Sequence, residues 1–131
     1  MCIRDRAHLP PAELGRVLSR SFRPLTEHTL ADGKRLRACL EGVRREGYAV
    51  AAEELELGFV AVGAPLFDAG GRPVAAISLG GTHTRLTDER VPAIGRLVRA
   101  AAARISHQLG YRREQTTDYT DSTDSEALKS V

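Results

Sequence analysis

Residues 58–79 read GFVAVGAPLFDAGGRPVAAISL. The run over residues 58–67 is mostly apolar and has the length of a strand, and residues 68–71 (DAGG) are a turn signal. Residues 72–79 have the composition of a returning strand. Together these segments predict a β-hairpin, and we expect the glycine pair at 80–81 to end its second strand.

Two helices are expected before the hairpin. The first spans residues 10–20 and begins with two prolines, which a helix tolerates in its first turn. A connector over residues 22–29 leads to the second helix. Asp32 is placed to cap its start, and Gly47 is placed to end it, because glycine accepts the left-handed cap conformation. Its apolar positions recur at helical spacing: Leu36, Leu40 and Val43.

A short strand, a loop and a long helix complete the pattern. Residues 48–50 read as a strand, residues 53–56 as a polar loop and residues 82–86 as a second loop. We expect Thr87 to cap the longest helix and Gly110 to end it. The apolar face of that helix comprises Val91, Ile94, Val98, Ala101, Ile105 and Leu109. The order of elements predicts an α+β fold with helices against a mostly antiparallel sheet.

Length and composition predict a single globular domain, and we expect a cytoplasmic location. The chain has 131 residues, enough for a single core. No apolar run approaches the ~20 residues of a membrane helix, and the start lacks the apolar region of a secretory signal. The net charge of +2 and the scattered arginines do not indicate nucleic-acid binding by this chain.

The sequence lacks the usual marks of an enzyme or a metal site. Cys2 and Cys39 are the only cysteines, and two thiols can make neither a disulfide framework nor a four-ligand zinc site. The histidines at 28, 83 and 107 have no metal-ligand spacing. Ser78 with His83 invites a hydrolase interpretation, but no third group or nucleophile elbow accompanies them. We therefore expect no catalysis and no cofactor.

The two ends differ from the rest of the chain. Residues 1–6 resemble a translated transposon-type sequencing adapter, the alternative being a natural N-terminal arm. Residues 112–131 are rich in Thr, Ser and Asp, hold little apolar surface and are expected to be disordered. Residues 7–111 would then be the folded part.

One run of residues at fixed spacing carries a family resemblance. Residues 40–48 (LEGVRREGY), residues 75–79, residues 84–87 and the alanine-rich helix ending at Leu109-Gly110 all contribute. The positions with signature spacing are Gly47, Glu54, Gly58, Ala61, Val62, Gly63, Leu66, Phe67 and Asp68. In these positions the chain resembles the C-terminal effector-binding domain of IclR-type transcriptional regulators.

The resemblance implies a GAF/profilin-like sensor fold that encloses a small organic acid. Relatives assemble as dimers or tetramers and carry an N-terminal winged helix-turn-helix that binds DNA. Residues 1–36 contain neither that domain nor the first strands of the sensor sheet. We therefore expect an N-terminally truncated fragment that would act on DNA only through the missing part.

Four residues are the candidate effector site. Ser78 matches a serine that contacts the effector in relatives. Phe59 and Ala61 lie two apart and therefore on one face of their strand. In relatives that face forms part of the pocket wall. Gly80 stands where relatives place a serine, and Ala51 stands where they prefer Asp or Ser. These losses of polar groups favour an apolar effector such as an aromatic acid. The structural alternative is that Phe59 and Ala61 are core and that Ser78 bonds to backbone.

Two further alternatives remain open. Glu54 matches the signature glutamate and is assigned a structural role, bonding to neighbouring backbone or an arginine, while Glu53 beside it belongs to a solvated turn. The chain could also be an oligomerisation module with a vestigial pocket, because the 87–109 helix has an alanine-rich face. Under that hypothesis, substitution of Ser78 would change neither assembly nor repression.

Overall fold

The computed structural model describes residues 6–112. The predicted adapter-like segment and the predicted tail lie outside the described residues, apart from Arg6 and Arg112. The elements are α2 (Pro11–Leu18), α3 (Gly33–Glu46), β1 (Ala49–Ala52), β2 (Phe59–Phe67), β3 (Pro73–Thr82) and α4 (Val91–Gln108). The expected α+β fold with an antiparallel sheet is confirmed. Over this range no helix is long and apolar enough to cross a membrane.

The predicted hairpin forms the centre of the sheet, whose strand order is β1-β2-β3. Asp68 holds its turn, because its carboxylate accepts hydrogen bonds from the backbone N–H groups of Gly70 and Arg72, each at 2.9 Å. The Arg72 guanidinium adds an ion pair at 2.9 Å. The Arg72 backbone bond, with these other contacts, lowers the pKa of Asp68 below its ordinary value.

The second strand of the hairpin is longer than predicted. The glycine pair at 80–81 does not end β3, which continues to Thr82. Gly81 pairs with Val60 and Gly80 with Ala61. The pairing of β2 with β3 extends to Phe59, the first residue of β2, which lies opposite Thr82. The backbone hydrogen bonds of this pairing outweigh the weak preference of glycine for strands. The short strand is also displaced: β1 covers residues 49–52 rather than 48–50, so Ala51 lies within it.

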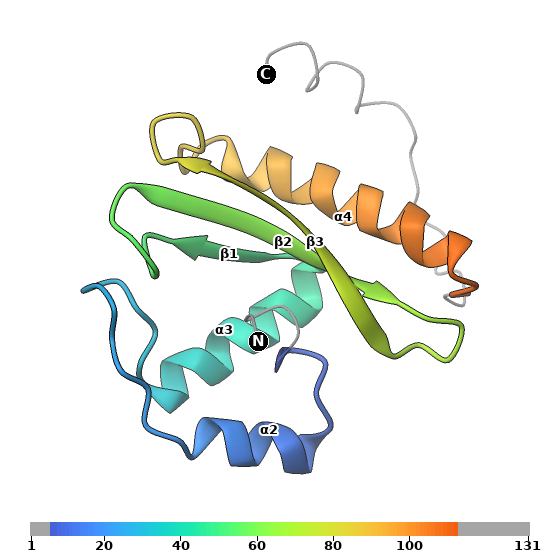
Figure 1. Cartoon of the computed structure of the whole chain (residues 1–131), viewed down its shortest axis with the longest axis horizontal. Coiled ribbons are helices and arrows are strands. Elements are labelled where there is room, and N and C mark those ends of the chain that lie inside the picture. Colours follow the sequence, from blue (N-terminus) through green and yellow to red (C-terminus); the bar gives the residue numbers. More distant parts are fainter. Residues whose placement is uncertain (1–5, 113–131) are drawn as a thin grey trace.

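Helices cover both faces of the sheet, as Figure 1 shows: α4 lies along one side, and α2 and α3 lie on the other. Alternate residues of β2 point to opposite faces. The side chains of Val60, Val62, Ala64 and Leu66 are buried with Ile94, Val98 and Ala102 of α4. On the other side, Ala49 of β1 packs with Leu36, Leu40 and Val43 of α3.

The predicted ends of α3 are confirmed. The Asp32 carboxylate accepts hydrogen bonds from the N–H groups of Lys34 and Arg35 at 3.2 and 3.3 Å. Gly47 adopts the left-handed conformation, with φ of 78°, and closes the last turn through its N–H to the Val43 carbonyl. α3 therefore leads directly into the start of the sheet.

The start predicted for α4 is wrong. Thr87 does not cap it with its side chain, and the helix begins at Val91 with Pro92 in its first turn. The Thr87 carbonyl instead accepts the N–H groups of Arg90 and Val91, which forms a separate turn before the helix. At the other end Leu109 lies past the helix with 47% of its surface exposed, while Ser106 is only 1% exposed.

Within residues 6–112, one edge of β2 has no strand beside it beyond Gly63, because β1 pairs only with residues 60–63. Alternate residues of a strand turn their backbone groups to opposite neighbours, so positions 65 and 67 face this open edge. Pro65 has no N–H to offer. The Phe67 N–H donates to Ser106 Oγ at 3.0 Å, and that hydroxyl donates to the Ala102 carbonyl at 2.8 Å.

Candidate functional site

The four predicted site residues lie together on one face of the sheet. In the β2–β3 register Ala61 lies opposite Gly80 and Gly63 lies opposite Ser78. Directly opposed residues project to the same face. Phe59 lies two residues before Ala61 and therefore shares that face, which is opposite to the one that α4 covers.

A cavity of about 440 Å³ lies over this face. Three of the four predicted residues, Phe59, Ala61 and Ser78, contribute to its lining, and so does Ala51 of β1. Leu25 and Leu55 add apolar surface and are 62% and 68% exposed. A mostly apolar cavity with a few polar groups is the usual form of a small-molecule site.

Gly80 does not line the cavity, but it determines where the Phe59 ring lies. A Cβ atom built on Gly80 would be 2.6 Å from Cζ of Phe59, closer than real Cβ contacts. The ring therefore occupies the space that a side chain at position 80 would need. Phe59 remains 39% exposed, so the ring is also open to solvent.

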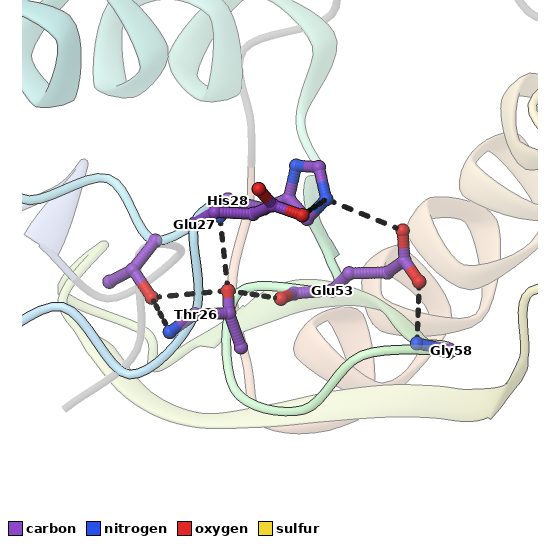
Figure 2. Close-up of polar contacts among 6 residues, drawn as sticks. Thr26, Glu27, His28, Glu53 and Gly58 are labelled. Atoms are coloured by element: carbon purple, nitrogen blue, oxygen red, sulfur yellow. Dashed lines mark hydrogen bonds and ion pairs between the residues drawn. The ribbon is translucent and has the colours of Figure 1, made fainter.

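Two segments that are far apart in the sequence both contribute to the lining of the cavity, one through Leu25 and Thr29 and the other through Glu54 and Leu55. Figure 2 shows polar contacts that join them. Thr26 Oγ1 donates to the Glu53 carbonyl at 2.6 Å, and Thr29 Oγ1 donates to the Glu54 carbonyl at 2.7 Å. His28 Nε2 lies 3.8 Å from Glu53 Oε2. We call these contacts the threonine clasp. It joins the predicted connector to the loop between β1 and β2.

The structural role assigned to Glu54 belongs to its neighbour. The Glu53 carboxylate accepts a hydrogen bond from the Gly58 N–H across the loop, with Glu53 itself at a φ of 55° (Figure 2). Glu54 is one of the residues that line the cavity, and no hydrogen bond of its carboxylate is present within residues 6–112. Burial raises the pKa of Glu54 above its ordinary value, because the ionised form loses hydration there.

The sequence did not predict that residues from the two segments joined by the threonine clasp line the cavity. Leu25 and Thr29 come from a segment predicted only as a connector, and Leu55 from one predicted as a polar loop. Two signals were present: threonines three residues apart, whose hydroxyls often bond to nearby backbone, and leucines at 55 and 57 inside an acidic loop. Local sequence does not show which loop the threonines will contact, because that contact depends on the tertiary fold.

A larger cavity, of about 700 Å³, lies elsewhere, between the C-terminal ends of α3 and α4. Its lining includes Arg44 and Arg99 and contains none of the predicted site residues. Both arginines already donate to backbone carbonyls, those of Ala7 and Glu46. The smaller cavity is the better candidate site, because it contains three of the predicted residues, Phe59, Ala61 and Ser78, at strand positions with a defined register.

The site has the composition of a binding pocket. Among residues 6–112 no group of three or more His, Cys, Asp or Glu side chains is placed to hold a metal ion. Cys39 lies near Glu54; burial and then the Glu54 charge raise the pKa of its thiol, which favours the protonated, unreactive form. The Ser78 hydroxyl can donate to an anion, and Phe59 can pack against an apolar group.

Comparison with known proteins places this geometry among transcriptional regulators. The family model described as "Bacterial transcriptional regulator IclR C-terminal" matches residues 6–107. The HTH-type transcriptional repressor AllR of Salmonella typhimurium is 38% identical over 99 residues, which are 76% of this chain and 36% of that protein. The chain thus spans about a third of the length of such curated relatives.

Solved structures agree. The repressor BlcR of Agobacterium tumefaciens superposes with a TM-score of 0.79 at 28% identity, covering 85% of this chain and 45% of that one. IclR of Thermotoga maritima gives a TM-score of 0.77 at 35% identity, covering 83% and 44%.

Proposed function

The chain belongs to the IclR family of bacterial transcriptional regulators, and from that premise we propose that its cavity binds a small organic acid that modulates DNA binding elsewhere in the regulator. The chain is the C-terminal domain of such a regulator, in a family of effector-binding domains. The observation that carries the proposal is the convergence of Ser78, Ala61 and Phe59 on one cavity. Sensing by this domain requires binding alone and no catalytic step.

The lining favours an acid with an apolar or aromatic body. Ser78 supplies a hydroxyl that can donate to a carboxylate, while Ala51 and Ala61 supply none. The Phe59 ring, together with Leu25 and Leu55, offers apolar surface to the rest of the ligand. Benzoate is therefore expected to bind more tightly than pyruvate or glyoxylate.

Isothermal titration calorimetry of the full chain with these three acids tests the proposal. Ser78→Ala should weaken binding of benzoate roughly tenfold, because one hydrogen bond to a charged group is lost. Ser21→Ala, an exposed serine outside the cavity, is the matched control and should bind like the parent. Equal affinities for the two serine variants would contradict the assignment of Ser78.

A second role rests on α4, where Ala103 is exposed and Ala100 half-buried, so that a partner helix could approach closely. If the domain served only to assemble dimers or tetramers, no acid would bind. Light scattering would then show an assembly that is insensitive to Ser78→Ala and weakened by Ala103→Glu. If Ser78→Ala weakens ligand binding while the mass stays constant, the domain senses a ligand whether or not it also assembles.

A further inference from the structure

The Glu54 side chain is the polar feature of the cavity that the proposed function leaves unused. Within residues 6–112 its carboxylate has no hydrogen bond and no ion pair, although its backbone carbonyl is held by Thr29 Oγ1 at 2.7 Å. The clasp therefore fixes the backbone of Glu54, and Glu54 lines the same cavity as Ser78. The carboxyl group of a lining residue is within reach of a ligand that binds in the cavity.

The charged and titratable groups around Glu54 leave it without a close counter-ion. Arg6 lines the same cavity, but its guanidinium lies over the Phe22 ring, 5.3 Å from the ring centre. Cys39, from α3, is a neutral thiol whose pKa is raised in part by the Glu54 charge. The next carboxylate along the chain, Glu53, is engaged by Gly58 and lies near His28.

An ionised acid that entered this cavity would meet an ionised Glu54, and two like charges in one partly dehydrated site repel each other. One shared proton removes the conflict and turns Glu54 into a donor. We propose that Glu54 is a specificity-determining residue that binds the organic acid through a shared proton, its protonated carboxyl group donating a hydrogen bond to the ligand carboxylate. The inference rests on the proposed function. The raised pKa of Glu54 supports it, because burial already favours the protonated form.

Proton uptake follows from this arrangement. Above the pKa of Glu54 in the free protein, each bound anion brings one proton with it, which comes from solvent. Affinity then falls about tenfold per pH unit as the pH rises, until Glu54 ionises in the complex as well. A cationic ligand would show the opposite slope, since it would pair with the ionised carboxylate.

Benzoate is the probe, because its own carboxyl group stays ionised between about pH 5.5 and 8. We expect the affinity of the parent chain for benzoate to fall over this range. Titration in two buffers of different ionisation enthalpy should report uptake of about one proton at the upper end of the range. Glu54→Gln supplies an amide N–H donor without a proton to gain. Its affinity should not change with pH, and at about pH 8 it should exceed that of the parent.

Glu56→Gln is the matched control, since Glu56 lies in the same loop, is exposed and does not line the cavity. It should keep the pH dependence of the parent. Benzoate binding without proton uptake, or with the same pH profile in Glu54→Gln as in the parent, would overturn the shared proton and leave the proposed function intact. Absence of binding by all three proteins at every pH would overturn the proposed function as well. Thermal unfolding of each variant verifies that it is folded.

Discussion

At the residue scale, the absence of a side chain at Gly80 allows the Phe59 ring to lie where it does in the candidate site. Because position 80 is glycine, the Phe59 ring lies against the backbone of β3, where a Cβ atom would be 2.6 Å from its Cζ. The alternation of residues along β2 made the shared face of Phe59 and Ala61 predictable from sequence, since that alternation is a backbone property. Ser78, on β3, was predicted from the family resemblance. The contact between Phe59 and Gly80 was not predictable, because it depends on the pairing register and on a side-chain rotamer.

Gly80→Ser should therefore exchange one ligand preference for another. The new Cβ displaces the Phe59 ring, and benzoate affinity should fall roughly tenfold, in the range of one lost aromatic contact. The added hydroxyl can bind a small acid, so pyruvate affinity should hold or rise. Calorimetry with both acids measures the ratio. Gly81→Ala lies on the same strand but contacts Leu86 at 3.4 Å on the other face, and a similar change there would contradict the explanation.

At the scale of elements, the sequence correctly predicted those helix ends and turns that depend on a few adjacent residues. The Asp32 cap, the Gly47 stop and the hairpin turn at Asp68 all formed as predicted. The predicted start of α4 was wrong: Thr87 satisfies the same local pattern, yet the helix begins four residues later, at Val91, with Pro92 in its first turn. The threonine clasp escaped prediction because its two segments are separated by 25 or more residues, and their meeting depends on the fold.

The clasp should stiffen the loop that carries Glu54. Thr26→Val keeps the shape but leaves the Glu53 carbonyl without its donor, and should cost roughly 1 kcal/mol of unfolding free energy. Hydrogen exchange should accelerate at the Gly58 and Phe59 amides, which bond across the loop. Thr84→Val, in an exposed loop elsewhere, is the control. Unchanged exchange at Gly58 would show that the clasp does not order the loop.

The contact between the start of the sheet and α4 depends on a small residue. The Tyr48 ring lies against Gly95, and a Cβ atom there would overlap the ring. Gly95→Ala should cost roughly 1–3 kcal/mol, measured as a lower urea midpoint, although alanine is the better helix former. Gly15→Ala in α2, where nothing lies within 4 Å, should be neutral or stabilising. If Gly95→Ala also stabilises, Tyr48 is not packed as described.

For the whole molecule, burial of the Glu54 carboxyl group makes stability depend on pH. Its folded pKa is raised above the ordinary value of 4.5, so the folded state binds the proton more tightly than the unfolded state. The free energy of unfolding therefore falls as the pH rises from 4.5 through the folded pKa. Glu54→Gln should be more stable than the parent at about pH 8, and the difference should shrink as the pH approaches 4.5. Urea unfolding at several pH values measures it, with Glu56→Gln expected to show no such trend.

The open edge of β2 has a consequence for how the chain behaves at high concentration. An uncovered strand edge is a template on which another chain can add a strand, the first step of aggregation. Here the two positions that point to this edge offer no donor: Pro65 lacks the N–H and is buried, and the N–H of Phe67, which is partly buried, is taken by Ser106. This edge therefore resists growth by strand addition without any charged residue on it. Its protection comes from one imino acid, one buried hydroxyl and the rings of His8 and Tyr111 that pack on Phe67. Substitution of Pro65 or Ser106 would remove one of these protections.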